Sequence, residues 1–325
     1  MADDGVEVRL ALQGLTDIHC HGALGAEFGN DTDGSMRAAA HHRETGTQTV
    51  IASLVSASPE VLERRVTTLG TLVRAGVIGG IHLEGPFLAL GRAGAHDHGA
   101  LTVPDAALVT RLAEVSADAG APGALKHWTF APELPGTDDL VRALADHGIL
   151  PAIGHTDGTA DDVERTLGLV TALTGREGLI THLFNAMPPL HHRAGGPVAA
   201  ALSAASRGEA VVELITDGVH VSPEVVRFVF DTIGPDRIAL VSDAMTATGL
   251  GAGDYRLGSL DVRVDAGVAR VRLPEGGVGP IAGSTATLAD CVRWAVEVAR
   301  VPFEDAMRAA TLTPQRVLGG SAAAA

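Results

Sequence analysis

Apolar runs of strand length recur eight times along this chain, and amphipathic helical stretches separate most of them. The runs lie at about 15–20, 48–55, 77–84, 125–131, 149–155, 179–184, 210–216 and 238–243. Helical periodicity marks the intervening segments, such as 59–74, 104–119, 138–147, 159–173 and 222–233. A strand and a helix repeated eight times predict an α/β fold, a (β/α)8 or TIM barrel. A doubly wound open sheet is the competing fold.

A single domain is the simplest organisation, because the chain contains no internal repeat and no linker. We expect a short N-terminal extension at 1–13, the barrel at 14–319 and a disordered tail at 320–325. Apolar and polar residues alternate at about 254–272, on both sides of Asp265-Ala266-Gly267. This pattern predicts a β-hairpin insertion after the eighth strand.

Composition and charge argue against two classes of partner, nucleic acids and membranes. The net charge of −15 argues against a nucleic-acid partner, because binding phosphate backbones requires clustered Lys and Arg. No apolar run reaches the length of a membrane span, and the acidic start Met1-Ala2-Asp3-Asp4 lacks the basic region of a secretory signal. Cys20 and Cys291 are the only cysteines, which suits a reducing compartment. We therefore expect a cytoplasmic protein with neither nucleic acid nor membrane as a partner.

Residues that commonly bind metals fall at the ends of the predicted strands. His19 and His21 stand two apart on the first strand, so their side chains share one face. Glu84 ends the third strand, and His155 and His182 end the fifth and sixth. The carboxyl ends of barrel strands meet at one mouth, where such a set is typical of a catalytic zinc-type site. The alternative, for each histidine alone, is a neutral ring hydrogen-bonded in the barrel interior.

Four further polar residues extend this interpretation. Asp17 precedes the histidine pair and is expected to orient it. Asp243 ends the eighth strand, where its carboxylate could accept a proton from water and return it to a leaving amine; the alternative is a structural carboxylate. His220 lies just beyond the seventh strand and could polarise a carbonyl or contact a substrate anion. Arg193 lies in a glycine-containing loop and could bind phosphate, or it could be a surface arginine.

Eight short motifs in one order make the chain resemble the N-acetylglucosamine-6-phosphate deacetylase family of the amidohydrolase superfamily. The resemblance extends from about residue 14 to residue 319. The motifs are Asp-Ile-His-Cys-His-Gly at 17–22, Leu-Glu-Gly-Pro-Phe at 83–87, Gly-His-Thr at 154–156, Thr-His-Leu-Phe-Asn-Ala-Met at 181–187, Asp-Gly-Val-His at 217–220, Leu-Val-Ser-Asp-Ala at 240–244, Ala-Gly-Ser-Thr at 282–285 and Pro-Gln-Arg-Val-Leu-Gly at 314–319.

This resemblance implies a divalent metal, one or two ions per subunit, with zinc the first candidate and Fe, Mn, Co or Ni the others. The metal residues that it implies are Glu84, His155, His182, His19, His21 and Asp243. Glu84, His155 and His182 would hold the principal ion. His19 and His21 would hold a second ion, bridged by Glu84, and Asp243 would be the general base and then the general acid.

The resemblance also implies the substrate. N-acetyl-D-glucosamine 6-phosphate would be hydrolysed to glucosamine 6-phosphate and acetate, in amino-sugar catabolism and cell-wall recycling. The residues at the family's substrate positions are His96, Asn185, Ala186, Arg193 and His220. Because the family supplies the phosphate-binding arginine across a dimer interface, a homodimer is expected.

One departure from the family concerns its small β-sandwich domain. The segments outside the predicted barrel are short, so we expect this domain to be missing or vestigial. Two rival functions stay open from the sequence. The first is a deacetylase of N-acetylgalactosamine 6-phosphate or of another acylated amino sugar, and the second is a noncatalytic sugar-phosphate binding protein.

Overall fold

The structure, a computed structural model, describes residues 12–273 and 276–319. Most of the expected 1–13 extension and all of the expected 320–325 tail lie outside the described residues, so both stay predictions. Among the described residues, no helix is long and apolar enough to cross a membrane.

Eight parallel strands form the central barrel in the order in which they occur in the chain. They are β1 (Leu15–Cys20), β4 (Thr47–Val55), β5 (Gly80–Glu84), β6 (Leu125–Phe130), β7 (Leu150–Ile153), β8 (Gly178–Ile180), β9 (Ala210–Ile215) and β10 (Ile238–Val241). The barrel closes where the end of β1 meets the segment after β10. There the Asp243 N–H donates to the His19 carbonyl (2.9 Å) and the His21 N–H donates to the Ala244 carbonyl (2.7 Å). The predicted barrel is confirmed, and the open doubly wound sheet is excluded.

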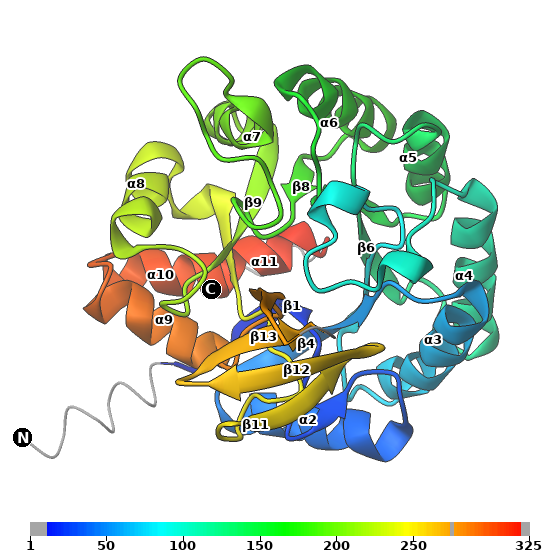
Figure 1. Cartoon of the computed structure of the whole chain (residues 1–325). Coiled ribbons are helices and arrows are strands. Elements are labelled where there is room, and N and C mark those ends of the chain that lie inside the picture. The colour runs from blue at the N-terminus through cyan, green and yellow to red at the C-terminus, as the bar shows by residue number, and fades with distance from the viewer. Residues whose placement is uncertain (1–11, 274–275, 320–325) are drawn as a thin grey trace, which may run out of the picture.

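Helices surround the barrel on its outside (Figure 1). They are α2 (Thr32–Glu44), α3 (Pro59–Arg74), α4 (Ala106–Asp118), α5 (Thr137–Asp146), α6 (Ala160–Thr174), α7 (Gly196–Ser206), α8 (Pro223–Ile233), α9 (Leu288–Glu297), α10 (Phe303–Ala310) and α11 (Leu312–Val317). Helix α8 begins one residue after the start of the predicted range 222–233, with Ser222 as its N-cap residue and Pro223 in its first turn. Within residues 12–273 and 276–319 there are also three single-turn 3-10 helices, η1 (Leu90–Arg92), η2 (His98–Ala100) and η3 (Pro235–Arg237).

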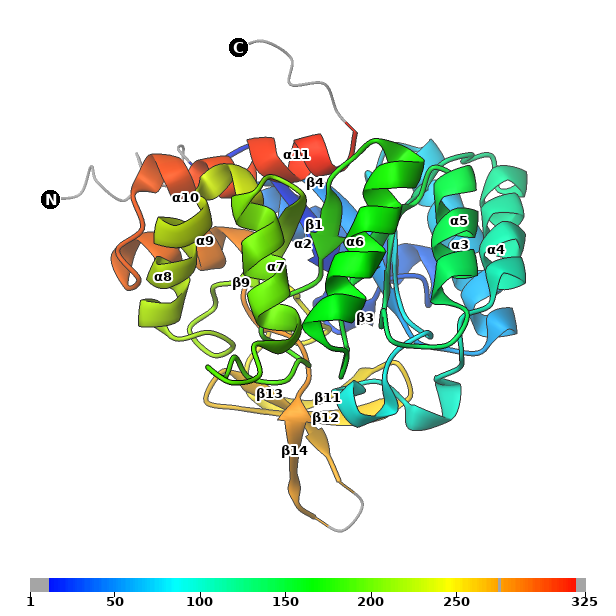
Figure 2. The ribbon, with the colours of Figure 1, turned by 90° about the horizontal axis from the view of Figure 1, so that it is seen from above.

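Burial of apolar side chains between the barrel and these helices explains why the strands are apolar on both faces. Two large clusters lie in that layer, one including Leu214 and Val229 and the other including Leu83 and Leu112. A smaller cluster joins residues of six barrel strands to Val317 of α11. Helix α11 lies at the end of the barrel opposite the sheet described next (Figure 2). The apolar interior is therefore concentrated away from the barrel mouth.

The predicted hairpin is the centre of a larger sheet. Strands β12 (Leu260–Asp265) and β13 (Val268–Arg272) pair antiparallel through the expected turn, and β11 (Gly253–Leu257) and β14 (Val278–Ile281) flank them. Figure 2 shows this four-stranded sheet beyond the mouth of the barrel. A two-stranded pair, β2 (Gly22–Ala23) with β3 (Ala26–Glu27), follows β1. Whether the family's β-sandwich is missing or vestigial stays a prediction.

Three of the barrel strands end earlier than the sequence predicted. Strands β7, β8 and β10 stop at Ile153, Ile180 and Val241, two residues before the polar residue that was expected to close each strand. Those residues, His155 (φ 48°), His182 (φ 24°) and Asp243 (φ 50°), have positive φ, which lies outside the β region. Conformations of this kind are costly for residues with a Cβ atom and cluster at functional sites. The strand ends therefore turn these three side chains toward the mouth.

Candidate metal centre and active site

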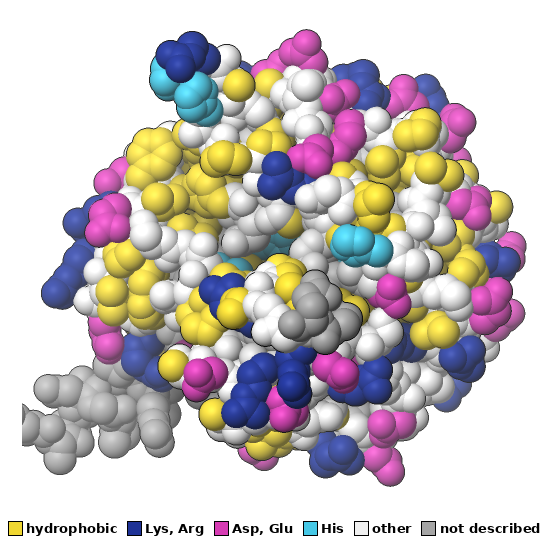
Figure 3. Space-filling view, in the orientation of Figure 1, with side chains coloured by type: hydrophobic (Ala, Val, Ile, Leu, Met, Phe, Trp, Pro, Cys, Tyr) yellow, Lys and Arg dark blue, Asp and Glu magenta, His cyan; other side chains and the backbone are white. Residues whose placement is uncertain are grey.

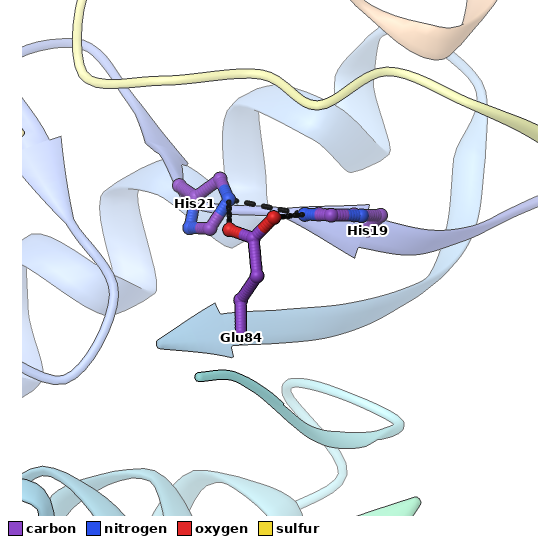
Figure 4. A group of neighbouring side chains, drawn as sticks. All are labelled: His19, His21 and Glu84. Carbon is purple, nitrogen blue, oxygen red and sulfur yellow. Dashed lines mark hydrogen bonds and ion pairs between the residues drawn. The ribbon is translucent and has the colours of Figure 1, made fainter. Parts of the chain in front are cut away.

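Two groups of side chains at the barrel mouth could each hold a metal ion, and they share Glu84. One group is His19, His21 and Glu84, and the other is Glu84, His155 and His182. Figure 4 shows the first group, with both imidazoles of the β1 segment directed at the carboxylate at the end of β5. All five side chains are buried, with at most 6% of each exposed. The structure therefore brings together five of the six residues that the sequence singled out as metal residues, and the sixth, Asp243, lies beside them.

The group formed by Glu84, His155 and His182 is compact. Glu84 Oε1 lies 3.0 Å from His155 Nε2 and 3.0 Å from His182 Nε2, and the two Nε2 atoms are 3.0 Å apart. Two imidazole nitrogens and a carboxylate oxygen are the donor set that Zn²⁺ and similar ions prefer. Three such atoms facing one another at contact distance offer a divalent ion three donors from one side.

The hydrogen bond on the far side of His155 supports that conclusion. His155 Nδ1 lies 2.8 Å from the carbonyl oxygen of Arg92, which can only accept, so Nδ1 must carry a proton. In the neutral ring, Nε2 then presents a lone pair to the Glu84 carboxylate. Two acceptors at 3.0 Å repel each other unless a proton or a metal ion lies between them, and an Nδ1 proton donated to a carbonyl is the arrangement that metal-ligating histidines adopt. The residues present therefore fit a divalent ion.

Asp243 lies next to the group formed by His19, His21 and Glu84. His21 Nε2 lies 3.2 Å from Glu84 Oε2, 3.3 Å from Asp243 Oδ1 and 3.2 Å from His19 Nε2. Burial lowers the pKa of His21, but hydrogen bonds to Asp243 and Glu84 outweigh it and raise the pKa to about 9. Burial raises the pKa of the Glu84 carboxyl, but the charge of His19 and the other imidazoles hold it well below its usual range. The two carboxylates are thus ionised and stabilise positive charge between them.

The carboxylate that contacts the His19 ring is Glu213, and the expectation that Asp17 would do so was wrong. Asp17 accepts from the Ser242 hydroxyl (2.5 Å) and from the backbone N–H of His19 (3.2 Å), so it contacts neither imidazole ring. Glu213 Oε2 lies 2.9 Å from His19 Nδ1. The signal for Glu213 was present in the sequence, because it interrupts the otherwise apolar run 210–215.

A cavity of about 500 Å³ opens over these groups. Figure 3 shows the hollow near the barrel axis, with histidine side chains visible at its base. Four of the five predicted substrate residues line it, namely His96, Asn185, Ala186 and His220. His96 reaches into the metal centre, with its Nε2 3.3 Å from Glu84 Oε2, and burial lowers its pKa to about 4. The imidazole of His96 is therefore neutral at physiological pH.

His220 has the opposite electrostatic character. Its Nδ1 lies 2.8 Å from Asp217 Oδ2. Burial lowers the pKa of His220, but the hydrogen bond and the charge of Asp217 outweigh the burial and raise it. His220 can therefore offer a proton from its other ring nitrogen to an oxygen atom in the cavity.

The fifth predicted substrate residue, Arg193, does not line the cavity of this chain. It is exposed in the loop between β8 and α7, and its guanidinium contacts His192 (Nη1 to Nε2, 2.8 Å). In Figure 1 that loop projects outward from the barrel. Two arginines that sequence reasoning missed, Arg92 and Arg270, do line the cavity. Nothing in their local sequence distinguishes them from surface arginines.

The fold and the mouth residues together define the class: a (β/α)8 barrel hydrolase of the amidohydrolase type. Amidohydrolase 2 from Bifidobacterium longum subsp. infantis shares this fold, with a TM-score of 0.51 at 13% identity over 95% of this chain and 100% of that one. A comparison with family models gave no match.

Similarity to individual proteins identifies the family. N-acetylglucosamine-6-phosphate deacetylase of Homo sapiens is 32% identical over 321 residues, 96% of this chain and 75% of that protein. The Vibrio furnissii protein of the same name is 32% identical over 95% of this chain and 73% of its own length. The structure of the Mycobacterium smegmatis deacetylase in complex with N-acetyl-D-glucosamine-6-phosphate gives a TM-score of 0.86 at 41% identity, covering 95% of this chain and 77% of that one. The chain belongs to the N-acetylglucosamine-6-phosphate deacetylase family, as the sequence motifs predicted.

Proposed function

We propose that this chain hydrolyses the N-acetyl group of N-acetyl-D-glucosamine 6-phosphate, giving glucosamine 6-phosphate and acetate. The observation that carries the proposal is the pair of ligand groups sharing Glu84, with Asp243 beside them at the mouth of a cavity. The solved complex of a relative with N-acetyl-D-glucosamine-6-phosphate supports the same substrate. On the sequence grounds given above, we place the reaction in the cytoplasm.

Glu84, His155 and His182 would hold the principal ion, and His19 and His21 would hold a second ion together with Glu84. When bound, a divalent ion polarises the acetyl carbonyl and makes water a stronger acid. Zinc is the first candidate, and Fe, Mn, Co and Ni suit the same donors. The buried carboxylates provide the negative charge that retains the ion.

Asp243 would act first as the general base and then as the general acid. Its Oδ1 lies 3.3 Å from His21 Nε2 and 3.6 Å from His19 Nε2, at the rim of the ligand groups. Burial raises the pKa of the Asp243 carboxyl, but the hydrogen bond to His21 and the charges of both histidines lower it below its usual value. An ionised carboxylate there can accept a proton from the attacking water and pass it to the amine as the C–N bond breaks.

Residues that line the cavity would bind the sugar. His96 is neutral and lies beside the ligand groups, and Asn185 and Ala186 line the same cavity. His220 is the candidate for an anionic or carbonyl oxygen because Asp217 favours its protonated form. Arg193 would bind the phosphate in the partner's cavity of a homodimer, since its exposed loop directs it away from its own.

Acetate release by the purified, metal-analysed protein tests this function. The substrates are N-acetylglucosamine 6-phosphate, its galactosamine epimer and unphosphorylated N-acetylglucosamine. Fast turnover of the first alone, abolished by a chelator and restored by Zn²⁺, is the expected result. Turnover of the epimer alone would reassign the substrate. No turnover by a protein with full metal content would leave the noncatalytic binding protein as the remaining interpretation.

Replacing Arg193 by Ala should weaken binding of the phosphorylated substrate, because a charge-assisted hydrogen bond is lost. We expect KM to rise by about 10- to 100-fold, corresponding to roughly 1.5–3 kcal/mol, with a smaller change in kcat. Turnover of the unphosphorylated sugar should not change. Steady-state kinetics on both substrates provides the measurement.

Arg207→Ala is the matched control for this variant. Arg207 is also exposed, but it lies just beyond the other end of α7 and pairs with Glu209 (2.7 Å). An unchanged KM for Arg193→Ala, or equal effects of the two substitutions, would remove Arg193 from the phosphate site.

A further inference from the structure

Glu213 is a carboxylate in the middle of a buried strand, and one of its oxygens contacts a residue of each ligand group. It lies in β9 between Val212 and Leu214, with 0% of its side chain exposed. Glu213 forms ion pairs with His19 and His127, and no Lys or Arg of the described residues pairs with it. An isolated buried carboxylate is costly unless it is hydrogen-bonded, so its position calls for a specific role.

We infer that Glu213 is a positioning residue that fixes His19 as a metal ligand, and so controls retention of the ion at the His19–His21–Glu84 group. The inference rests on the metal centre of the proposed function. Glu213 Oε2 lies 2.9 Å from His19 Nδ1 and also accepts from the backbone N–H of His182 (3.2 Å). One carboxylate oxygen thus contacts one residue of each ligand group.

The first of these contacts sets the tautomer of His19. A carboxylate can only accept, so the proton of the neutral ring must be on Nδ1. His19 Nε2 then carries the lone pair, and it lies 3.2 Å from His21 Nε2, 3.5 Å from Glu84 Oε1 and 3.6 Å from Asp243 Oδ1. A carboxylate behind a ligating histidine also raises the basicity of the ligand nitrogen.

The other three histidines of the centre have no such carboxylate. His155 Nδ1 donates to the Arg92 carbonyl. His21 Nδ1 and His182 Nδ1 have no hydrogen-bond partner among the described residues. His19 is therefore the imidazole of the centre with a carboxylate on its far side, and the group that contains His19 should be the more sensitive to loss of Glu213.

The test is metal retention in Glu213→Gln, which keeps the shape of the side chain and removes its charge. Wild type and variant, both loaded with Zn²⁺, are dialysed against graded chelator, and bound metal is measured by mass spectrometry. We expect the variant to lose one of two ions at about 10- to 100-fold lower chelator strength, with the other ion retained as in wild type. Retention of both ions as in wild type, simultaneous loss of both, or a wild type with one ion would each overturn the inference.

Asp17→Asn is the matched control. Asp17 is likewise fully buried and contacts His19, but only through the backbone N–H. Its loss should lower thermal stability and leave the retention of both ions unchanged. Selective loss of one ion in this variant too would mean that any buried carboxylate near β1 has the effect, which contradicts a specific role for Glu213.

A His19→Ala background separates positioning from folding and applies even if Glu213→Gln alone folds poorly. Without the imidazole, Glu213 has no ring to orient, so adding Glu213→Gln should leave the affinity for the remaining ion within about twofold. A further 10-fold loss would show that Glu213 acts through the His182 backbone instead. Metal content is independent of acetate release, so a chain that proved inactive on every sugar could still satisfy this test.

Discussion

Asp243→Asn should lower kcat by roughly 10²- to 10⁴-fold, the range that general acid–base groups contribute, while the protein keeps its metal. The amide has the shape of the carboxylate but can neither accept the proton of the attacking water nor protonate the leaving amine. The ligand groups at Glu84 do not include Asp243, so the bound metal should change little. Steady-state acetate release measures kcat, and metal analysis of the same sample measures the bound metal.

Asp138→Asn is a suitable control, because Asp138 is exposed on α5 and pairs with Arg165 away from the cavity. Its kcat should equal that of wild type. Near-normal turnover of Asp243→Asn would remove Asp243 from the proton-transfer role. If Asp243→Asn lost metal and activity in parallel, the main role of Asp243 would instead be that of a metal ligand.

Glu84→Gln should abolish activity by removing the residue that both ligand groups share. An amide binds divalent ions much more weakly than a carboxylate, so neither ion should be retained after dialysis. Losing several kcal/mol of transition-state stabilisation corresponds to a decrease in rate on the order of 10³-fold or more. Metal content and acetate release, before and after addition of excess Zn²⁺, measure the effect.

Glu27→Gln controls for the loss of a buried carboxylate as such. Glu27 is 4% exposed and pairs with Arg65 (2.9 Å), away from the metal centre. That variant should be destabilised by a few kcal/mol, because a buried guanidinium loses its partner, and should keep its metal. If Glu84→Gln retained one ion with substantial activity, the shared role of Glu84 would be wrong.

The barrel was predictable from sequence because apolar runs of strand length alternate with amphipathic helical stretches along most of the chain. Helix α3 was predicted at its observed bounds, Pro59–Arg74. The ends of β7, β8 and β10 were not predictable, because positive φ at His155 or Asp243 is imposed by the site and not by local propensity. The four-stranded sheet was recognised only in its central hairpin, since the short β14 (Val278–Ile281) has no alternating pattern.

The ligand residues were predictable because parallel strands deliver their carboxyl ends to one mouth. The contact partner of Glu213 was not predictable: the sequence shows that a carboxylate interrupts an apolar strand but does not reveal what that carboxylate faces. Asp17 was assigned the orienting role because it is close to His19 in the sequence, whereas the group that contacts the ring comes from β9. The phosphate-binding role of Arg193 remains a prediction, because the phosphate that it would contact lies in the cavity of a second subunit.

The junction between β1 and β10, which closes the barrel, links metal binding to the stability of the barrel. Between β1 and β10 the described residues form no regular ladder, and the contact consists of a few bonds, such as Asp243 N–H to the His19 carbonyl. His19 and His21 lie on one side of this seam and Asp243 on the other. An ion held by His19, His21 and Glu84 would connect the β1 side of this seam to β5, and its positive charge would attract the Asp243 carboxylate on the other side, which lies 3.3 Å from His21 Nε2. Loss of metal should then loosen the molecule first along this seam.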